Sequence, residues 1–378
     1  LLSSSAERNY MSRIEFMNGH LSLADGTEVP QESLYVASHR LIKDYVHERL
    51  EIVNYNAFPV MLRVSMQLTA DFADMFEVRG AFRGDRGLYL EPRLGEREAE
   101  LAYLGADKLL RRTRVRFSER PVELAATATP HGTGFKVSFD VHVAAGGGRA
   151  SLETTIEPLL AGVQEAAGIR PFADLGSWLM KEQKRRQHGQ AQLSSDNEIY
   201  NLVLERSVVD LETLSSILPG TGPYIAAGLP WFACPFGRDA LIAAYQTLLL
   251  GPELAKGTLR YLAKHQGREV NDYRDEEPGK ILHEIRYGEL TDLGQVPHSP
   301  YYGSIDSTPL YLILISETYR WTGDLDFVRE MWDSVEQALM WIDAYGDQDG
   351  DGFLEYATRS PRGMFNQCWK DSLISNVF

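Results

Sequence analysis

The chain has 378 residues, 44% of them hydrophobic and 24% charged, a composition typical of a soluble globular protein with two or three domains. Its net charge of −15 excludes the basic surface of a nucleic-acid-binding protein, and no apolar run reaches the roughly 18 residues of a membrane span. The two cysteines, Cys234 and Cys368, cannot build a disulfide framework. They fit a cytoplasmic protein, although the chain begins Leu1-Leu2-Ser3 without Met, which leaves an upstream signal peptide open.

The first part of the chain is predicted to form antiparallel strands. Apolar and polar residues alternate over residues 60–69, 112–117 and 135–143, the pattern of a strand with one buried and one wet face. Turn signals such as Gly146-Gly147-Gly148 separate these runs. Several such strands in series indicate an N-terminal antiparallel β-sandwich over residues 1–158.

Around residue 158 the alternation ends. Residues 159–196 combine short helical stretches with a basic, polar tail, which predicts a helical linker. At its end, Ser195 to Glu198 has the spacing of a capping box and predicts the start of a helix.

From residue 197 onward two kinds of helix alternate. Residues 239–250 and 307–319 are apolar nearly all round, as in helices buried on every side, whereas residues 253–265 and 324–345 are amphipathic. Buried inner helices that alternate with amphipathic outer helices are typical of an (α/α) barrel, so residues 197–378 are predicted to be the first part of such a toroid. The apolar face predicted for the last helix consists of Leu325, Val328, Trp332, Val335 and Leu339.

Three aromatic and polar segments, residues 228–239, 301–307 and 366–372, stand where inner helices begin. Because the inner helices of a toroid run in one direction, we expect these segments to meet at one mouth. Aromatic rings with carboxylates and an arginine suit a carbohydrate, whose ring stacks and whose hydroxyls need charged partners. The alternative, tryptophans as core residues and Asp239 and Asp306 as N-caps, is less favoured because three segments converge. The expected cavity contains Trp231, Phe232, Arg238, Asp239, Tyr301, Tyr302, Asp306, Trp369 and Asp371.

Two further segments carry charged side chains. Residues 279–290 place His283, Glu284, Arg286 and Glu289 on a connection longer than packing requires, which predicts a binding loop.

Residues 347–356 have the acidic spacing of the first half of a calcium loop at Asp347, Asp349 and Asp351. The twelfth position of that loop is Thr358 instead of a bidentate glutamate. A solvated turn is therefore favoured over a calcium site, and no cofactor is predicted.

In this order the segments resemble the signatures of bacterial amylo-α-1,6-glucosidases, the glycogen-debranching type of glycoside hydrolase with an (α/α)6 toroid. The resemblance covers nearly the whole chain. VPQESL and DFADMFEVRG look like signatures of the family's N-terminal β-domain. Five later segments of this chain look like successive signatures of the family's catalytic domain: PWFACPFGRDALIAAYQTL, HEIRYGE, YYGSIDSTPLY, DGDGFLEY and NQCWKDS.

The resemblance implies an inverting hydrolase that removes α-1,6-linked glucose from glycogen-derived α-gluco-oligosaccharides. It implies that Asp371 is the general acid that protonates the glycosidic oxygen. Arg238, Asp239 and Asp306 would hold the terminal glucose, and the loop of residues 279–290 would bind substrate as well. The expected substrate-binding residues are Trp231, Phe232, Arg238, Asp239, His283, Glu284, Arg286, Glu289, Tyr302, Asp306, Trp369 and Lys370.

Two departures from the family stand out. After Asp371 the family continues with a Trp and another Asp, where this chain has Leu373, Ile374 and Ser375. In addition, only part of a six-hairpin toroid is present, and the resemblance places the general base in the absent part. The chain therefore looks like a fragment that is inactive alone, with Glu284 and Glu289 as the alternative bases.

Two other functions stay open. One is a different toroidal α-glycosidase that acts on a small glucoside such as trehalose, and the other is a non-catalytic carbohydrate-binding remnant. The oligomeric state is not indicated by the sequence.

Overall fold

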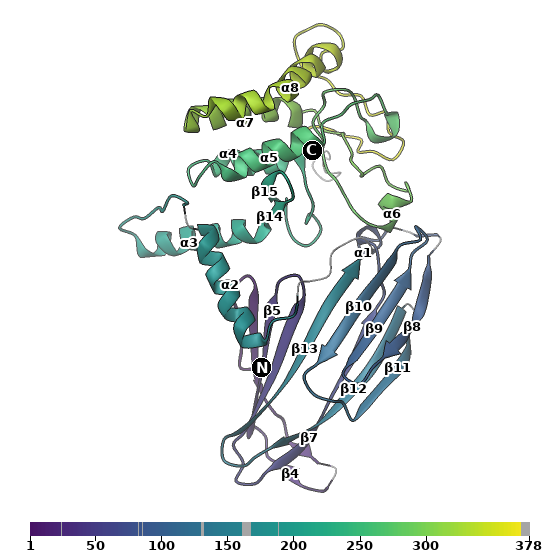
Figure 1. The fold of residues 1–378 in the computed structure, drawn as a ribbon, viewed down its shortest axis with the longest axis vertical. Coiled ribbons are helices and arrows are strands. Elements are labelled where there is room, and N and C mark those ends of the chain that lie inside the picture. The colour runs from purple at the N-terminus through teal and green to yellow at the C-terminus, as the bar shows by residue number, and fades with distance from the viewer. Residues whose placement is uncertain are drawn as a thin grey trace. The chain divides into compact units, whose positions relative to one another are not determined.

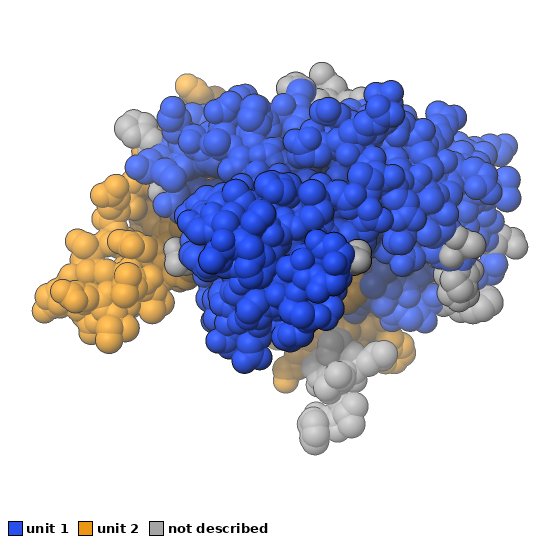
Figure 2. All heavy atoms as spheres, turned by 90° about the horizontal axis from the view of Figure 1, so that it is seen from below, with its two compact units in different colours: residues 1–185 blue, residues 186–378 orange. Residues whose placement is uncertain are grey.

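The structure is a computed structural model that describes residues 1–371, apart from residues 24, 82, 85, 130–131, 161–167 and 188. It forms two compact units, residues 1–185 and 186–378, which Figure 2 colours separately. Figure 1 labels the elements of each unit. The inner helix expected after Asp371, and the departures at Leu373, Ile374 and Ser375, lie outside the described residues.

The N-terminal unit consists of antiparallel strands, as predicted (Figure 1). A sheet of eight strands has the order β1-β2-β5-β6-β13-β10-β9-β8 and a sheet of three has the order β11-β12-β7. The larger sheet comprises β1 (Ser3–Arg8), β2 (Met11–Met17), β5 (Leu34–Ile42), β6 (Val46–Asn54), β8 (Leu88–Leu94), β9 (Glu98–Leu104), β10 (Leu110–Phe117) and β13 (Gly148–Leu160). The smaller sheet comprises β7 (Val60–Ala70), β11 (Glu123–Thr129) and β12 (Gly132–Val143), and a separate short pair is β3 (Leu21–Ser22) with β4 (Glu28–Val29).

Both sheets contribute to one apolar core. Alternate residues of β12, among them Phe135 and Phe139, are buried in the same cluster as Val115 and Phe117 of β10. The rings of Phe117 and Phe139 lie 5.5 Å apart between centroids, with an edge-on geometry. The strand alternation read from the sequence therefore places one face of each sheet in a shared interior.

Helix α2 (Phe172–Gln187) lies within the segment predicted as a linker, residues 159–196. Leu175 and Leu179 on one of its faces pack against Leu41 and Tyr45 of the N-terminal unit. The ammonium group of Lys43 lies 4.3 Å from the centre of the Trp178 ring, a cation–π distance. Most of this helix therefore belongs to the packed N-terminal unit.

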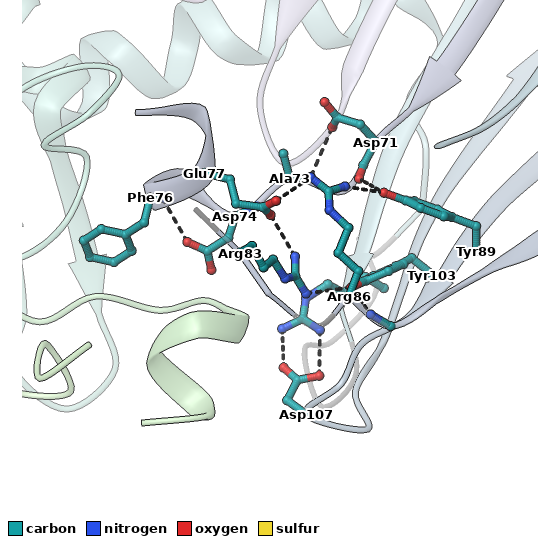
Figure 3. Close-up of polar contacts among 12 residues, drawn as sticks. Asp71, Ala73, Asp74, Phe76, Glu77, Arg83, Arg86, Tyr89, Tyr103 and Asp107 are labelled. Carbon is teal, nitrogen blue, oxygen red and sulfur yellow. Dashed lines mark hydrogen bonds and ion pairs between the residues drawn. The ribbon is translucent and has the colours of Figure 1, made fainter. Parts of the chain in front are cut away.

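The segment DFADMFEVRG forms a charged cluster beside the single-turn helix α1 (Met75–Val78), shown in Figure 3. Asp74 and Glu77 form a capping box at the start of α1. Glu77 also accepts hydrogen bonds from Arg83, at 2.8 Å, and from Arg86. Arg83 is buried and donates in addition to the Tyr103 hydroxyl at 2.7 Å. Glu77 of this segment is thus paired with two arginines that follow it in the chain, and these contacts fix the connection between β7 and β8.

The C-terminal unit is mainly helical (Figure 1). Its helices are α3 (Glu198–Leu214), α4 (Gly237–Gln246), α5 (Glu253–Lys264), α6 (Glu289–Asp292), α7 (Ser307–Thr322) and α8 (Leu325–Trp341), with a 3₁₀ turn at Asp272–Arg274 and a π turn at Ile342–Gly346. A hairpin of β14 (Ser215–Leu218) and β15 (Gly222–Ile225) follows α3. Helix α4 packs on α5 and α7, and α7 packs on α8 around one core. Within the described ranges no helix is both long and apolar enough to span a lipid bilayer.

Two local predictions for these helices are corrected. Helix α3 has Asn197 as its N-cap, whose side chain accepts from the Tyr200 N–H at 3.1 Å, so the predicted capping box from Ser195 is wrong. The face predicted for the last helix is wrong except at Val335, which is buried, because Leu325, Trp332 and Leu339 are 46%, 50% and 47% exposed. The face of α8 that is buried consists of Phe327, Met331, Val335, Ala338 and Trp341.

The exposed apolar side chains of α7 and α8 predict self-association. Ile313 on α7 is 50% exposed, and Trp332 and Leu339 on α8 are also accessible, whereas soluble monomers rarely expose apolar patches beyond about 300–600 Å². We expect the 378-residue chain to form oligomers at micromolar concentration, and the triple variant Ile313→Ser, Trp332→Gln, Leu339→Gln to form fewer. Sedimentation velocity measures both.

Val122 provides a control, because it is equally exposed but belongs to the N-terminal unit. Val122→Gln is expected to leave the association unchanged. A monomeric wild-type chain, or a triple variant that associates as strongly as the wild type, would contradict the prediction.

Candidate active site

Main-chain hydrogen bonds join the predicted site segments within the C-terminal unit. The Gly237 N–H donates to the His283 carbonyl at 2.7 Å, and the Tyr301 N–H donates to the Glu284 carbonyl at 2.9 Å. The Ile285 N–H donates to the Pro235 carbonyl at 3.0 Å. Residues 228–239, 279–290 and 301–307, which are distant in the sequence, therefore lie side by side. The first and third of these segments were expected to meet because each precedes a helix.

Arg238, in the first turn of α4, connects these segments to the end of the described chain. Its Nε donates to Asp306 Oδ2 at 2.6 Å, and its Nη1 donates to Asp371 Oδ2 at 2.8 Å. Its Nη2 donates to the Cys368 carbonyl at 3.0 Å. The side chains of Arg238, Asp306 and Asp371 are 8%, 22% and 27% exposed. One nearly buried guanidinium thus holds two carboxylates that remain within reach of solvent.

Asp306 stands at the N-cap position of α7 but does not act as a cap. Its side chain makes no capping hydrogen bond to that helix. Instead, Oδ1 accepts from the Ser304 hydroxyl at 2.7 Å while Oδ2 accepts from Arg238. The alternative in which this carboxylate merely caps a helix is therefore wrong.

Asp239 follows Arg238 in α4 and has a different electrostatic environment. Its side chain stays accessible to solvent, yet desolvation by the surrounding protein raises the pKa of its carboxyl group. The nearby charges of Arg238 and His283 act in the opposite direction. The site therefore combines carboxylates paired with arginine and a carboxyl group that retains its proton more readily.

Exposed aromatic rings lie on the same segments. Trp231 and Phe232 precede α4, and Trp369, which is 64% exposed, stands two residues before Asp371. Such rings offer flat apolar faces. Lys370 is also exposed. These four side chains are accessible, as contact with a ligand requires.

Tyr301 and Tyr302 occupy a different position from the one expected. Both are buried. The Tyr301 hydroxyl donates to Asp275 Oδ2 at 2.8 Å, and the Tyr302 hydroxyl donates to the His265 carbonyl at 2.9 Å. Their rings belong to the interior of the unit and offer no open face.

The segment with His283, Glu284, Arg286 and Glu289 is buried as well. Glu284 Oε2 accepts from Arg286 Nε at 2.6 Å, and Glu284 Oε1 lies 3.2 Å from His298 Nε2. Arg286 Nη1 donates to the Trp231 carbonyl at 2.5 Å. This segment supports the main chain that carries Trp231 and presents no charge to solvent.

Glu284 is the basis of a prediction on pH dependence. Burial would raise the pKa of its carboxyl group, but the hydrogen bond from His298 and the positive charges of His283, His298 and Arg286 lower it to about 2. A carboxylate with a lowered pKa stabilises the fold fully above its unfolded pKa, and this contribution is lost as the pH falls toward the folded pKa. The free energy of unfolding of the C-terminal unit should therefore fall as the pH decreases from about 5 toward 3.

The variant Glu284→Gln tests whether Glu284 causes this loss of stability at low pH. The variant should be less stable at pH 7, because Arg286 loses a buried partner. It should also show a shallower decrease in unfolding free energy between pH 5 and 3, measured by urea unfolding. An equally steep decrease in the variant would show that other carboxylates cause the acid sensitivity.

Sequence reasoning missed an acidic run that organises the unit. Asp275, Glu276 and Glu277 are consecutive and all buried. Glu276 accepts from the Arg268 N–H at 2.9 Å, and Glu277 accepts from Trp341 Nε1 at 2.8 Å. Three acids in succession ordinarily indicate a solvated loop, so composition gave no signal of burial.

The candidate calcium loop is exposed. The structure brings together ligand oxygens of Asp347, Asp349, Asp351 and Glu355, all within 4.8 Å of one another. Glu355, which is not at the twelfth position of the loop, is the fourth member of this group. The same carboxylates accept main-chain N–H groups of their own turn, such as that of Gly350 at 2.8 Å.

Comparisons with known proteins agree with the first part of this architecture. Residues 1–154 match the family model for the N-terminal domain of some glycogen debranching enzymes. No curated protein matches the chain by sequence.

Among solved structures, a putative kojibiose phosphorylase from the human microbiome is similar, with a TM-score of 0.58 and 10% identity over 87% of this chain. This chain spans only 44% of that protein. An inverting mannosidase of family GH92 from Bacteroides thetaiotaomicron has a TM-score of 0.33 and 11% identity, over 87% of this chain and 55% of its own. At such identities the first likeness concerns the fold alone, and the second is too weak to support an argument. The family match thereby confirms the resemblance read from the sequence over residues 1–154, which are similar to the N-terminal domain of some glycogen debranching enzymes.

Proposed function

We propose that the chain is part of a glycoside hydrolase of the amylo-α-1,6-glucosidase type, which removes α-1,6-linked glucose from glycogen-derived oligosaccharides with inversion. The observation that carries this proposal is the cluster in which Arg238 joins Asp306 and Asp371 beside Asp239. The family match of residues 1–154 supports the same class of enzyme. The pairs α4–α5 and α7–α8 would be the first hairpins of an (α/α)6 toroid.

Each group in the cluster has a proposed role. Asp371 protonates the glycosidic oxygen as the general acid. Arg238, Asp239 and Asp306 bind hydroxyls of the terminal glucose, because charged groups make the strongest hydrogen bonds to such hydroxyls. The exposed rings of Trp231 and Trp369 stack on the apolar face of the sugar.

The general base is proposed to lie outside residues 1–371. An inverting enzyme needs a second carboxylate roughly 6.5–9.5 Å from the acid, with room for a water molecule between them. Glu284 and Glu289 are buried, and Glu284 is engaged by Arg286 and His298. Neither carboxylate is open to the water that a base must activate, so the isolated chain should not hydrolyse glucosides.

One observation favours a second candidate, a carbohydrate-binding protein without turnover. Asp371 Oδ2 accepts from Arg238 Nη1 at 2.8 Å, so the proposed acid is held in an ion pair, as a carboxylate with a purely binding or structural role would be. In the hydrolase, substrate hydroxyls would have to take over part of the Arg238 contacts so that Asp371 could reach the glycosidic oxygen.

The experiment compares binding with turnover. Isothermal titration with panose and isomaltose tests whether the 378-residue chain binds, and Trp369→Ala should weaken that binding. Glucose release from the same sugars, from a limit dextrin and from trehalose is then followed in an enzyme that contains this chain. Release of β-glucose from α-1,6-linked sugars supports the proposal.

Two other outcomes are informative. Formation of glucose 1-phosphate, only in the presence of inorganic phosphate, would replace hydrolysis by phosphorolysis, the activity for which the similar kojibiose phosphorylase is named. Binding by the longer enzyme without turnover of any of these sugars would favour the non-catalytic alternative.

A further inference from the structure

We propose that Asp275 is a positioning residue that fixes the segment of residues 358–371 so that Asp371 reaches Arg238. This positioning role concerns the fold of the C-terminal unit and does not depend on a catalytic activity. Its consequence for catalysis rests on the function proposed above for Asp371.

The carboxylate of Asp275 accepts four hydrogen bonds. Oδ1 accepts from the N–H groups of Arg359, at 2.7 Å, and Ser360, at 2.9 Å. Oδ2 accepts from the Tyr301 hydroxyl at 2.8 Å and from Gln367 Nε2 at 2.9 Å. Three of the four donors belong to the segment that precedes Asp371. Asp275 is 4% exposed, so solvent cannot replace these partners.

The segment depends on such contacts because it has no regular secondary structure. From residue 354 to residue 371 the described chain contains neither helix nor strand. The Met364 N–H donates to the hydroxyl of Tyr301 at 2.8 Å, which extends the same cluster. An irregular segment of this length is held in place by side-chain contacts of this kind, because it lacks the repeating main-chain bonds of a helix or sheet.

Gln367 links Asp275 to the residues that contact Arg238. It is fully buried, its side chain donates to Asp275, and its carbonyl accepts from the Ile305 N–H at 2.8 Å. The carbonyl of the following residue, Cys368, accepts a hydrogen bond from Arg238 Nη2. Asp371 lies three residues further on and binds the same guanidinium. The path from Asp275 to the proposed acid therefore runs through adjoining hydrogen bonds.

A carboxylate is required at this position because all four partners donate. An amide has only one acceptor oxygen, and its NH₂ group would face donors. Asp275 also has a left-handed backbone conformation, with φ of 50°, which asparagine tolerates well. Asp275→Asn therefore removes the acceptor capacity without imposing a new backbone strain.

The test is hydrogen exchange followed by mass spectrometry on the full 378-residue chain. In Asp275→Asn, amides of residues 358–367 should exchange at least about tenfold faster, because hydrogen bonds to a charged acceptor are lost. The exchange of α4 and α5 should change by less. A merely structural role would accelerate exchange across the whole C-terminal unit.

Glu276→Gln is the matched control. Glu276 is equally buried and belongs to the same loop, but it binds Arg268 and Arg274. This variant should leave exchange in residues 358–367 unchanged. Gln367→Met removes a single donor and serves if Asp275→Asn does not fold. It should accelerate the same amides, and the double variant should add little to Asp275→Asn because both act on one contact.

The proposal is overturned if exchange in residues 358–367 is unchanged in both Asp275→Asn and Gln367→Met, or if Glu276→Gln accelerates it equally. In an active enzyme that contains the chain, Asp275→Asn should lower kcat at least about tenfold with KM within about twofold. Absence of activity in the wild-type enzyme would reject the proposed function, whereas the exchange result would still decide the positioning role.

Discussion

Arg238→Met is expected to destabilise the C-terminal unit by about 3 kcal/mol, the lower end of the range for removing one partner of a buried ion pair. The variant leaves the carboxylates of Asp306 and Asp371 near each other without a cation between them. Both carboxylates keep some exposure, which limits the cost. Urea unfolding followed by tryptophan fluorescence measures the loss. Arg238→Lys should recover only part of it, because an ammonium group lacks the planar fork that reaches two carboxylates and a carbonyl.

Arg260 offers a matched control in the same unit. It binds Glu330 through two hydrogen bonds of 2.7 Å, but both side chains are substantially exposed. Arg260→Met should therefore cost at most about 1 kcal/mol. If the two variants lose equal stability, the Arg238 cluster has no special role in holding the site segments. If Arg238→Met is harmless, the contact of Asp371 with Arg238 does not persist in solution.

The strands that the sequence predicted have one local property in common. In β7, β10 and β12 the alternation of apolar and polar residues reflects the pleat itself, so their positions could be predicted to within a few residues. The helices were located equally well, but not always their buried faces. Helix α8 carries apolar residues on two stripes, and contacts with α5 and α7 decide that Phe327 and Met331 are buried and Trp332 is exposed. The periodicity of the sequence alone does not indicate which of the two stripes is buried.

For the candidate site, the sequence predicted which segments come together, but it did not predict which of their side chains are buried. Arg238, Asp306 and Asp371 meet as expected, because their segments are held by main-chain bonds at the starts of packed helices. His283, Glu284 and Tyr302 were expected to face a ligand but are buried, and isolated main-chain bridges join Glu284 to Phe236 and to Tyr301. The role of Asp275 was not predicted, because its four hydrogen-bond donors lie between residues 301 and 367. Such a cluster depends on contacts distant in sequence, which a single sequence does not display.

Asp371→Asn should abolish most of the activity of an enzyme that contains this chain. Loss of a general acid lowers the rate by about 10²–10⁴ on substrates with a poor leaving group, such as an α-1,6-linked oligosaccharide. The amide can still accept a hydrogen bond from Arg238, so the free energy of unfolding should change little compared with Arg238→Met. Steady-state kinetics on panose should therefore show a large decrease in kcat with a smaller change in KM.

A substrate with an activated leaving group separates acid catalysis from positioning. Fluoride leaves without the strong protonation that a sugar alkoxide requires, so α-glucosyl fluoride should be cleaved by Asp371→Asn at a rate much closer to that of the wild type. Asp306→Asn is the comparison, since Asp306 binds the same guanidinium but has no proposed proton to donate. That variant should raise KM for both substrates alike. If Asp371→Asn slows both substrates equally, Asp371 binds sugar and does not donate the proton, and the accessible carboxyl group of Asp239, whose pKa is raised by desolvation, becomes the next candidate for the acid.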